Sequence, residues 1–420
     1  MTPEIKQRIE QIRRGEVPER YVKTALGLAP ANWKRYTFGD IYTERREPGD
    51  ENLPLLMVSI HSGVSDGEVD AAELPKQVKR IEDKSQYKKA VSGDLVFNMM
   101  RAWQGAIGTV RTTGMVSPAY IVAEPNDKAY PLFMDYYSRT PQMINQIDRQ
   151  SYGVTDFRKR LYWDSFAPIS CTLPPIEEQQ KIAAILTTQD KVIELKEKRL
   201  AEKQRQKKYL MQQLLTGKKR LPGFNGTWEK EKLGKCASMC SGGTPDTKNE
   251  KYYGNDYVWI SIKDMTSAGK YICSSERGLT EAGLLNCSAR LFPKGTILFA
   301  MYASIGECSI AETECCSSQA ILGIEPDSKL NNEFLYYLLS NSKGYFKSFG
   351  QASSQPNLNK GIVQSIVVQI PEIEEQAAIA EVLSTADREI ELLQQDIEQE
   401  KRKKKALMQL LLTGIVRVQT

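Results

Sequence analysis

The strongest constraint on the fold is a long segment that occurs twice. The sequence PPIEEQQKIAAILTTQD begins at Pro174 and recurs as PEIEEQAAIAEVLSTAD from Pro371, and both copies end in LLTG. Between residues 174–217 and 371–414, 23 of 44 positions are identical without a gap. Because loops tolerate insertions, a gap-free repeat of this length predicts one rigid element that is present twice.

The repeated element is predicted to be a long helix. Prolines and then acidic residues open each copy and a glycine ends it, as is typical of helix starts and stops. Apolar residues recur at a seven-residue spacing that indicates a narrow coiled-coil stripe. The stripe consists of Leu186, Ile193, Leu200 and Leu214 in the first copy and Leu383, Ile390, Ile397 and Leu411 in the second, with Lys207 and Lys404 as polar exceptions.

The charges of the two copies favour antiparallel pairing. Each copy begins with an acidic pair, at Glu177 and Glu178 or at Glu374 and Glu375, and becomes basic toward its end. Antiparallel helices would set each acidic start against the other basic end, whereas parallel helices would bring like charges together. The basic clusters could also be solvated helix faces, so this prediction rests on the reciprocal arrangement.

The remainder of each half is related as well. The segment SGDLVFNMMRAWQGAIGTV at 92–110 aligns with KGTILFAMYASIGECSIA at 294–311. Short apolar runs bounded by Gly, Asp and Pro predict strands, and helical spacing appears at 131–147 and 332–346. We therefore expect a mixed α/β (α+β) protein with an internal pseudo-two-fold repeat. The expected parts are an N-terminal helical extension at 1–29, globular domains at 30–173 and 218–370, and long helices at 174–217 and 371–420.

Composition limits the classes of protein that this chain can belong to. The 420 residues exceed what one hydrophobic core usually supports, and no run of 18 apolar residues or apolar leader occurs. We expect two or more domains and a cytoplasmic location. Eight cysteines without a CxxC pair and a single histidine, His61, argue against a zinc site and favour reduced thiols.

Motifs for catalysis are missing from the sequence. There is no GxxxxGK[ST] phosphate loop and no glycine-rich loop paired with an NPPY-like tetrad, and SGGTPDTK at 241–248 reads as a loop. His61 has no paired motif and is more readily explained as structural. We therefore expect a chain that is not an enzyme and binds no metal or cofactor itself.

Polar, basic and aromatic residues instead gather in loops of the globular parts, a pattern typical of a DNA-groove reader. Arginine and glutamine can each bond a base edge through two contacts. Trp103 is the weakest candidate, since an aromatic residue beside a strand more often belongs to the core, and Arg158 to Arg160 could form a solvated helix face. The candidate DNA-contacting residues are Arg101, Trp103, Gln104, Thr155, Arg158, Lys159, Arg160, Lys263, Tyr302, Ser304, Ser354, Gln355, Asn357, Asn359 and Lys360.

Taken together, these features resemble the specificity subunit of type I restriction-modification systems. The resemblance rests on LPPIEEQQKIAAIL and IPEIEEQAAIAEVL with their LLTG endings, and on GGTPDTKNEKYYGNDYVWISIKDM at 242–265. It implies two target recognition domains that each read one half of a split DNA site, joined by an antiparallel coiled coil. The first half has ERREPGDENLPLLMVS in place of a GGTP-like stretch, so we expect the two half-sites to differ.

The resemblance also implies partners. Methylation would belong to modification subunits that bind S-adenosylmethionine, and cleavage to a restriction subunit that uses ATP and Mg²⁺; double-stranded DNA would be the shared target. Outward apolar residues of the helices could dock these subunits or could thicken the helix seam: Ile182, Ile185, Leu210, Met211, Ile379, Leu407 and Met408. A scaffold that binds only proteins, and a methyltransferase or nuclease that acts alone, are the alternatives.

Overall fold

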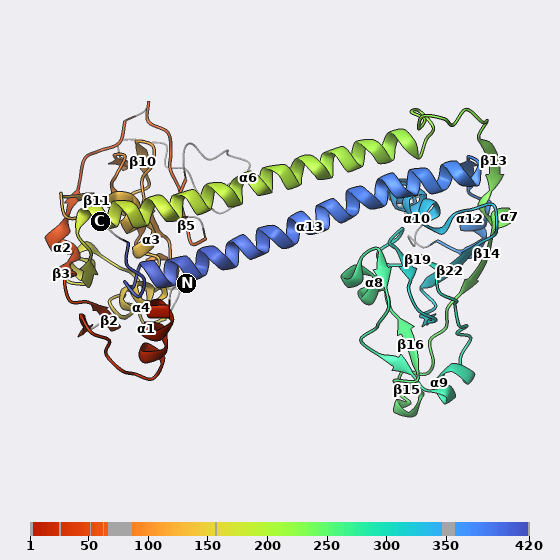
Figure 1. Cartoon of the computed structure of the whole chain (residues 1–420), viewed down its shortest axis with the longest axis horizontal. Helices are drawn as coiled ribbons and strands as arrows, with labels where there is room; N and C mark the ends of the chain where they lie inside the picture. Colours follow the sequence, from red (N-terminus) through yellow and green to blue (C-terminus); the bar gives the residue numbers. More distant parts are fainter. Residues whose placement is uncertain are drawn as a thin grey trace. The chain divides into compact units, whose positions relative to one another are not determined.

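The structure is a computed structural model that describes residues 3–24, 27–50, 52–61, 63–65, 86–155, 158–346 and 358–418. The chain divides into two compact units (Figure 1). The first unit comprises Met1–Leu195 and Ile397–Thr420, and the second comprises Lys196–Asp396. Each unit therefore contains one globular part and one half of each of two long helices, and both ends of the chain belong to the first unit.

The repeated segment folds as two helices of equal length. Helix α6 spans Ile176–Leu214 and helix α13 spans Ile373–Leu411, 39 residues each. Helix α6 begins directly after Pro174 and Pro175, α13 begins two residues after Pro371, and each carries two glutamates in its first turn. The helices are thus slightly shorter than the repeated segment, because the LLTG ending turns back at a glycine with positive φ.

Within each unit, contacts between α6 and α13 run in antiparallel order. In the second unit, Lys196 pairs with Asp396 at 2.8 Å and Lys203 pairs with Glu389 at 2.7 Å, so the position of the partner falls as the chain advances. In the first unit, Gln189 donates to a carboxylate oxygen of Glu400 at 2.6 Å. Lys203 also holds the pKa of Glu389 below its usual value.

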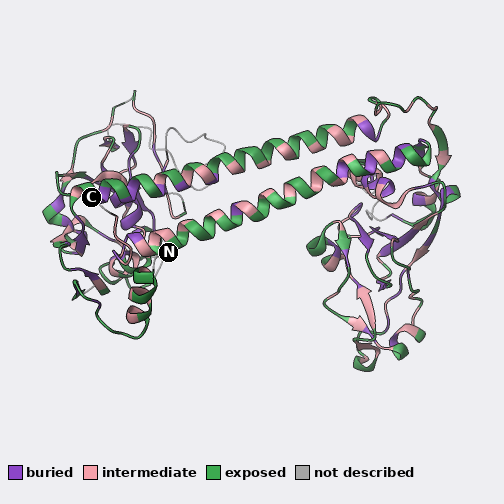
Figure 2. Cartoon of the chain, in the orientation of Figure 1, coloured by how far each residue is buried: buried purple, intermediate pink, exposed green. Residues whose placement is uncertain are grey.

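The residues of the apolar stripe are buried or half-buried, and Figure 2 shows buried and half-buried segments alternating with exposed ones along both helices. Leu186 and Leu383 are fully buried, whereas Leu200 and Ile390 are half-buried. The polar exceptions have a structural reason, because Lys207 pairs with Asp387 and Lys404 pairs with Asp190. The hydroxyl groups of Tyr337 and Tyr136 donate hydrogen bonds to Asp387 and Asp190, both at 2.6 Å. These bonds link the helices of each unit to its globular part. Burial and the Asp190 carboxylate raise the pKa of Tyr136 to about 12.

The globular part of the first unit is built on the four-stranded sheet β4-β11-β8-β9, which is antiparallel throughout. Its core joins the sheet to α3, α4, and the facing sides of α6 and α13. The elements are α1 (Pro3–Arg13), β1 (Tyr21–Thr24), β2 (Gly27–Pro30), β3 (Lys34–Thr37), α2 (Phe38–Ile41), β4 (Tyr42–Arg45), β5 (Val58–Ser59), β6 (Gly63–Val64), β7 (Lys88–Ala90), β8 (Leu95–Asn98), η2 (Ala102–Gln104), β9 (Ile107–Thr109), β10 (Gly114–Val116), β11 (Tyr120–Pro125), α3 (Pro131–Tyr137), α4 (Pro141–Arg149), α5 (Trp163–Phe166) and β12 (Ser170–Leu173).

The second unit carries a five-stranded sheet, β14-β22-β19-β20-β17, and a smaller one, β15-β18-β16-β21. Strand β22 lies between β14 and β19, as β11 lies between β4 and β8. The elements are β13 (Glu229–Lys232), α7 (Leu233–Cys236), β14 (Ala237–Ser241), η4 (Glu250–Tyr252), β15 (Tyr253–Gly254), β16 (Tyr257–Ile260), α8 (Ile262–Ala268), β17 (Tyr271–Ile272), β18 (Gly278–Leu279), α9 (Glu281–Leu285), β19 (Ile297–Ala300), β20 (Cys308–Ala311), β21 (Cys316–Ser317), β22 (Ile321–Pro326), α10 (Asn332–Asn341), α12 (Lys360–Ser365) and β23 (Val367–Ile370).

Local chemistry changes two of the expected elements. The helical run expected at 131–147 is two helices, since Thr140 accepts the backbone N–H of Met143 and Pro141 begins a new helix. The apolar run from Val258 to Ile262 predicts a strand as well, but β16 ends at Ile260, because Ser261 and Asp264 form a capping box that starts α8.

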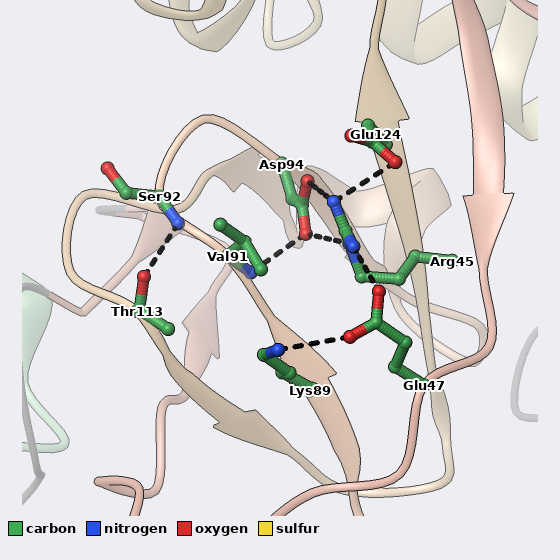
Figure 3. Close-up of polar contacts among 8 residues, drawn as sticks. All are labelled: Arg45, Glu47, Lys89, Val91, Ser92, Asp94, Thr113 and Glu124. Carbon is green, nitrogen blue, oxygen red and sulfur yellow. Dashed lines mark hydrogen bonds and ion pairs between the residues drawn. The ribbon is translucent and has the colours of Figure 1, made fainter.

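A polar cluster that is buried at Asp94, half-buried at Arg45 and exposed at Glu47 and Glu124 lies between strands of the first unit (Figure 3). Arg45 on β4 donates to both carboxylate oxygens of Asp94, at 2.7 and 3.3 Å, and pairs with Glu124 at 3.1 Å and Glu47 at 2.5 Å. Asp94 also accepts the backbone N–H of Val91. Burial raises the pKa of Asp94, while the Arg45 hydrogen bond opposes that rise. The two bonds from Arg45 to the buried Asp94 carboxylate therefore connect β4 to the residue that precedes β8.

Candidate nucleic-acid interface

The loop that follows β8 is fixed by its neighbours in the first unit. The backbone N–H of Met99 donates to Ala119 at 3.0 Å, and the backbone N–H of Leu161 donates to the carbonyl of Met99 at 2.8 Å. The second bond brings two candidate segments together that lie about sixty positions apart in the sequence. Arg101 and Gln104, at the two ends of this turn, are both exposed.

Trp103 and Lys159 link the two segments. The Trp103 ring is half-buried against the core, its Nε1 donates to Met100 at 3.0 Å, and the Lys159 ammonium lies 4.8 Å from its centroid. Lys159 also pairs with Asp148 at 2.8 Å. This pair therefore supports the loops from within, which agrees with the core alternative for Trp103 and leaves Lys159 less available to DNA.

Backbone bonds between Tyr152 and Arg160 hold the segment that carries the remaining candidates of the first unit. Tyr152 and Arg160 exchange backbone hydrogen bonds at 2.9 and 2.8 Å. A Cβ at Gly153 would lie 2.5 Å from the backbone of Arg158, so only glycine fits this close approach. Thr155 and Arg158 are exposed, while Arg160 is half-buried.

The second unit repeats this backbone arrangement. The backbone N–H of Met301 donates to Ala320 at 2.9 Å, and the backbone N–H of Leu358 donates to the carbonyl of Met301 at 3.1 Å. The candidates Tyr302 and Ser304 are half-buried in the turn after β19. Each unit thus joins the turn that follows a central strand to a segment preceding a long helix.

The other candidates of the second unit differ in their availability to DNA. Asn359 is the N-cap of α12, and its side-chain oxygen accepts the backbone N–H of Ile362 at 3.0 Å, so it serves the helix. Lys360 is exposed in the first turn of that helix. Ser354, Gln355 and Asn357 lie outside the described residues.

Lys263 also differs from the expectation. Its ammonium pairs with Glu276 at 2.5 Å, and this hydrogen bond raises the pKa of Lys263. The neighbouring carboxylate cancels the charge that was expected to attract DNA. Although its side chain is exposed, Lys263 is a weaker candidate than Arg101 or Arg158 for phosphate contact.

Burial separates the expected docking residues of the helices. Ile182 and Ile379 are 0% and 1% exposed within the cores of the two units, so they are not available to a partner, contrary to the expectation. Ile185 is 37% exposed. The others are half-buried against the cores and remain candidates: Leu210, Met211, Leu407 and Met408.

The sequence analysis missed the role of the glutamates that start the helices. Glu178 is buried and accepts two bonds from Arg417, at 2.7 and 2.8 Å, and one from Trp33 Nε1 at 3.3 Å. Glu375 accepts the equivalent bonds from Arg220, both at 2.6 Å, and from Trp228 at 3.2 Å. The signal was present, since these glutamates, arginines and tryptophans all recur in the two halves.

The adjacent glutamines complete the anchor. Gln179 donates to the carbonyls of Pro174 and Lys128 at 2.9 Å and accepts the backbone N–H of Tyr130 at 2.9 Å. Gln376 makes the corresponding bonds in the second unit. The EEQ motif therefore attaches each helix to the globular part that precedes it.

Two kinds of site have no support among the described residues. No group of three or more histidine, cysteine, aspartate or glutamate side chains there could hold a metal ion. The helices in the same part of the chain include none that is long and apolar enough to cross a membrane.

Comparison with known proteins identifies the family. The sequence matches "Type I restriction modification DNA specificity domain" over residues 73–204 and 225–401, which together make up most of the chain. The chain belongs to the type I restriction-modification specificity subunits. Type I specificity subunits have a DNA-recognition domain, which agrees with the loops described above.

One relative of this specificity subunit matches nearly its whole length, and another matches about two fifths of it. The putative MjaX specificity subunit of Methanocaldococcus jannaschii is 25% identical over 441 residues, covering 96% of this chain and 98% of that protein. The MjaIX specificity subunit of the same organism is 36% identical over 167 residues, which are 39% of each chain.

Solved structures share the fold. The HsdS subunit from Thermoanaerobacter tengcongensis matches with a TM-score of 0.50 and 20% identity, covering 92% of this chain and 98% of that one. The S subunit from M. genitalium matches with a TM-score of 0.56 and 12% identity, covering 93% and 97%. The two-domain specificity-subunit fold is thus common to all three.

Proposed function

We propose that this chain is the non-catalytic DNA-reading subunit of a type I complex and that each of its two recognition domains reads one half of a bipartite site. One observation carries this proposal. Each unit joins the turn after its central strand to a second segment through the same backbone bonds, at Met99 and Leu161 or at Met301 and Leu358. Because the same pair of joined loops occurs in both units, we expect each unit to contact one DNA half-site in a similar way.

The two long helices are proposed to form an antiparallel coiled coil. The buried heptad stripe and the antiparallel order of the ion pairs support this pairing. A stiff helix pair of fixed length would hold the two recognition domains at a fixed separation. It would thereby set the length of the spacer between the half-sites. The domain boundaries follow the repeat: 1–29, 30–173, 174–217, 218–370 and 371–420.

The chemistry is proposed to belong to partner subunits in the cytoplasm, where they would defend the host. Modification subunits would supply S-adenosylmethionine, and a restriction subunit would use ATP and Mg²⁺. Ile185, Leu210, Met211, Leu407 and Met408 would contribute to docking. These residues carry apolar surface on the two helices and are not fully buried.

A binding and activity experiment tests the proposal. The purified chain, incubated with DNA, S-adenosylmethionine and Mg²⁺, should neither methylate nor cleave, whereas the complex assembled with its modification subunits should methylate one bipartite motif. Binding of that complex to its site should weaken steeply as salt rises. If no DNA is bound under low salt and a protein partner is still captured, the chain is a scaffold that binds only proteins.

A further inference from the structure

An arginine is held against an aromatic ring in the smaller sheet of the second unit. Arg277 directly precedes β18, and its guanidinium carbon lies 4.1 Å from the centroid of the Tyr253 ring. The ring contacts Trp259 edge-on at 6.1 Å, and its hydroxyl donates to the carbonyl of Pro245 at 3.1 Å. Trp259 in turn donates to the carbonyl of Gly243 at 2.9 Å.

The backbone around this pair is tightly packed. A Cβ at Gly278 would lie 2.5 Å from the carbonyl oxygen of Gly254 and 2.6 Å from that of Tyr257. Strand β18 is therefore closely enclosed by β15 and β16, both of which pair with it. The position of Arg277 relative to Tyr253 is consequently set by the sheet as well as by the stacking.

The charge of Arg277 remains available. The residue is exposed, and the carboxylate of its neighbour Glu276 is engaged by Lys263. Within the described part of the chain, Arg277 forms no ion pair with a carboxylate. A stacked guanidinium keeps its planar set of donors in one orientation, which suits a partner with two acceptor atoms.

The pair is connected to the candidate loop of the second unit. The backbone N–H of Ser318 donates to Ile260 at the end of β16 at 3.0 Å, and that of Met301 donates to Ala320 at 2.9 Å. A segment of three residues, 318–320, thus joins the small sheet to the turn after β19. Tyr253 and Trp259 also belong to the stretch after GGTP, for which the first half has a different sequence.

We infer that Arg277 contacts DNA from the second recognition domain, with Tyr253 as its positioning residue. Its ligand is a pair of acceptors on DNA, either O6 and N7 of a guanine or two phosphate oxygens. The inference rests on the proposed function and adds a named reader to it. A contact that belongs to one half-site alone has to lie where the two halves differ, as Tyr253 does.

The test uses the full chain assembled with its modification subunits. Methylome sequencing of a strain that carries the wild-type complex first defines the motif, and a duplex with that motif is the binding probe. If Arg277 reads guanine, Arg277→Ala should relax one position of one half-site by about tenfold or more. If it binds phosphate, the motif should persist while the slope of log K against log salt becomes shallower by about 0.9.

Further variants identify the source of the effect. Arg277→Lys should restore binding only in the phosphate case, because lysine lacks the planar donor pair. Tyr253→Leu should reproduce part of the Arg277→Ala effect, and Tyr253→Phe should recover it, since the ring is retained. Lys294→Ala is the matched control, because it removes one exposed charge at the opposite end of β19 from the candidate turn.

The outcomes separate the inference from the proposed function. A wild-type motif in two halves, with Arg277→Ala changing neither the motif nor the salt slope, would overturn the inference alone. An Arg277→Ala effect that Lys294→Ala equals would also overturn it, since bulk charge would then explain the loss. A wild-type complex that binds no DNA, or methylates an undivided motif, would overturn the proposed function and the inference with it.

Discussion

Two separate physical reasons account for the glutamates Glu178 and Glu375 at the starts of the long helices. In the sequence they are acidic residues in a first helical turn, where the helix dipole favours them. In the structure each is buried and paired with an arginine that follows the other long helix, Arg417 or Arg220. Burial makes the pairing necessary, because an isolated buried carboxylate is costly.

Removal of one arginine should therefore destabilise the unit to which it belongs. Arg417→Met leaves the Glu178 carboxylate, whose side chain is 1% exposed, without its cation. We expect the free energy of unfolding of the first unit to fall by about 3 kcal/mol, as for other broken buried pairs. Urea unfolding followed by hydrogen exchange in each unit measures this.

The double variant Arg417→Met with Glu178→Gln serves as its control. Because the uncompensated charge is then absent, part of the lost stability should return. Equal unfolding of wild type and Arg417→Met in both units would show that the pair contributes nothing.

Individual cations of the recognition loops should report on phosphate contact. Arg101 and Arg158 are exposed in the two joined loops of the first unit. For each of Arg101→Ala and Arg158→Ala, we expect weaker binding of the assembled complex and a slope of log K against log salt that is shallower by about 0.9. Fluorescence anisotropy over a salt series gives both numbers, and unchanged slopes in both variants would exclude phosphate contact at these positions.

At the scale of elements, the sequence predicted the long helices well and the small sheets poorly. The seven-residue apolar spacing continues along helices of 39 residues each, so many positions independently predict a helix. Strands β15 and β18 have two residues each and exist because the glycines around them allow close approach. Such short pairings depend on distant neighbours, which a local pattern cannot reveal.

The candidate site was predictable only in part, for a similar reason. The exposed residues Arg101, Gln104 and Arg158 were identified from loop position alone. That Lys263 faces Glu276, and that Asn359 caps α12, depends on partners that the pattern of residue types does not specify. Arg277 was not among the candidates, because the ring that holds its guanidinium belongs to Tyr253, 24 positions earlier in the chain.

Exchange of one globular element tests the independence of the two readers. Replacing residues 218–370 by the equivalent part of a relative, with both long helices unchanged, should alter one half-site and leave the other half-site and the spacer as they were. The bonds of Gln376 to residues 329–331 indicate which contacts the replacement has to preserve. Methylome sequencing reads both half-sites at once, and a joint change in both would show that the domains do not read separately.

At the scale of the whole molecule, the length of the helices can be changed to test whether it determines the spacer between the half-sites. Four residues inserted between Lys196 and Lys203 would lengthen α6 by about 6 Å and rotate its continuation by about 40°. A coiled coil absorbs an insertion of four by local unwinding, so the pairing of the helices should survive. We expect unchanged half-sites and a spacer longer by one or two base pairs.

The same sequencing experiment measures this change. A four-residue substitution with alanines on the exposed side of α6 controls for local sequence effects without altering length. Full methylation with the original spacer would show that the helices do not determine the distance between half-sites.

The pairing of Arg417 with Glu178 also bears on the order in which the protein is made. Domains usually fold as units while the chain leaves the ribosome, earlier ones first. Here the second unit is one continuous stretch, 196–396, whereas the first also needs 397–420. The first unit therefore cannot complete its core, and Glu178 stays without its arginine, until residues 397–420 have been synthesised.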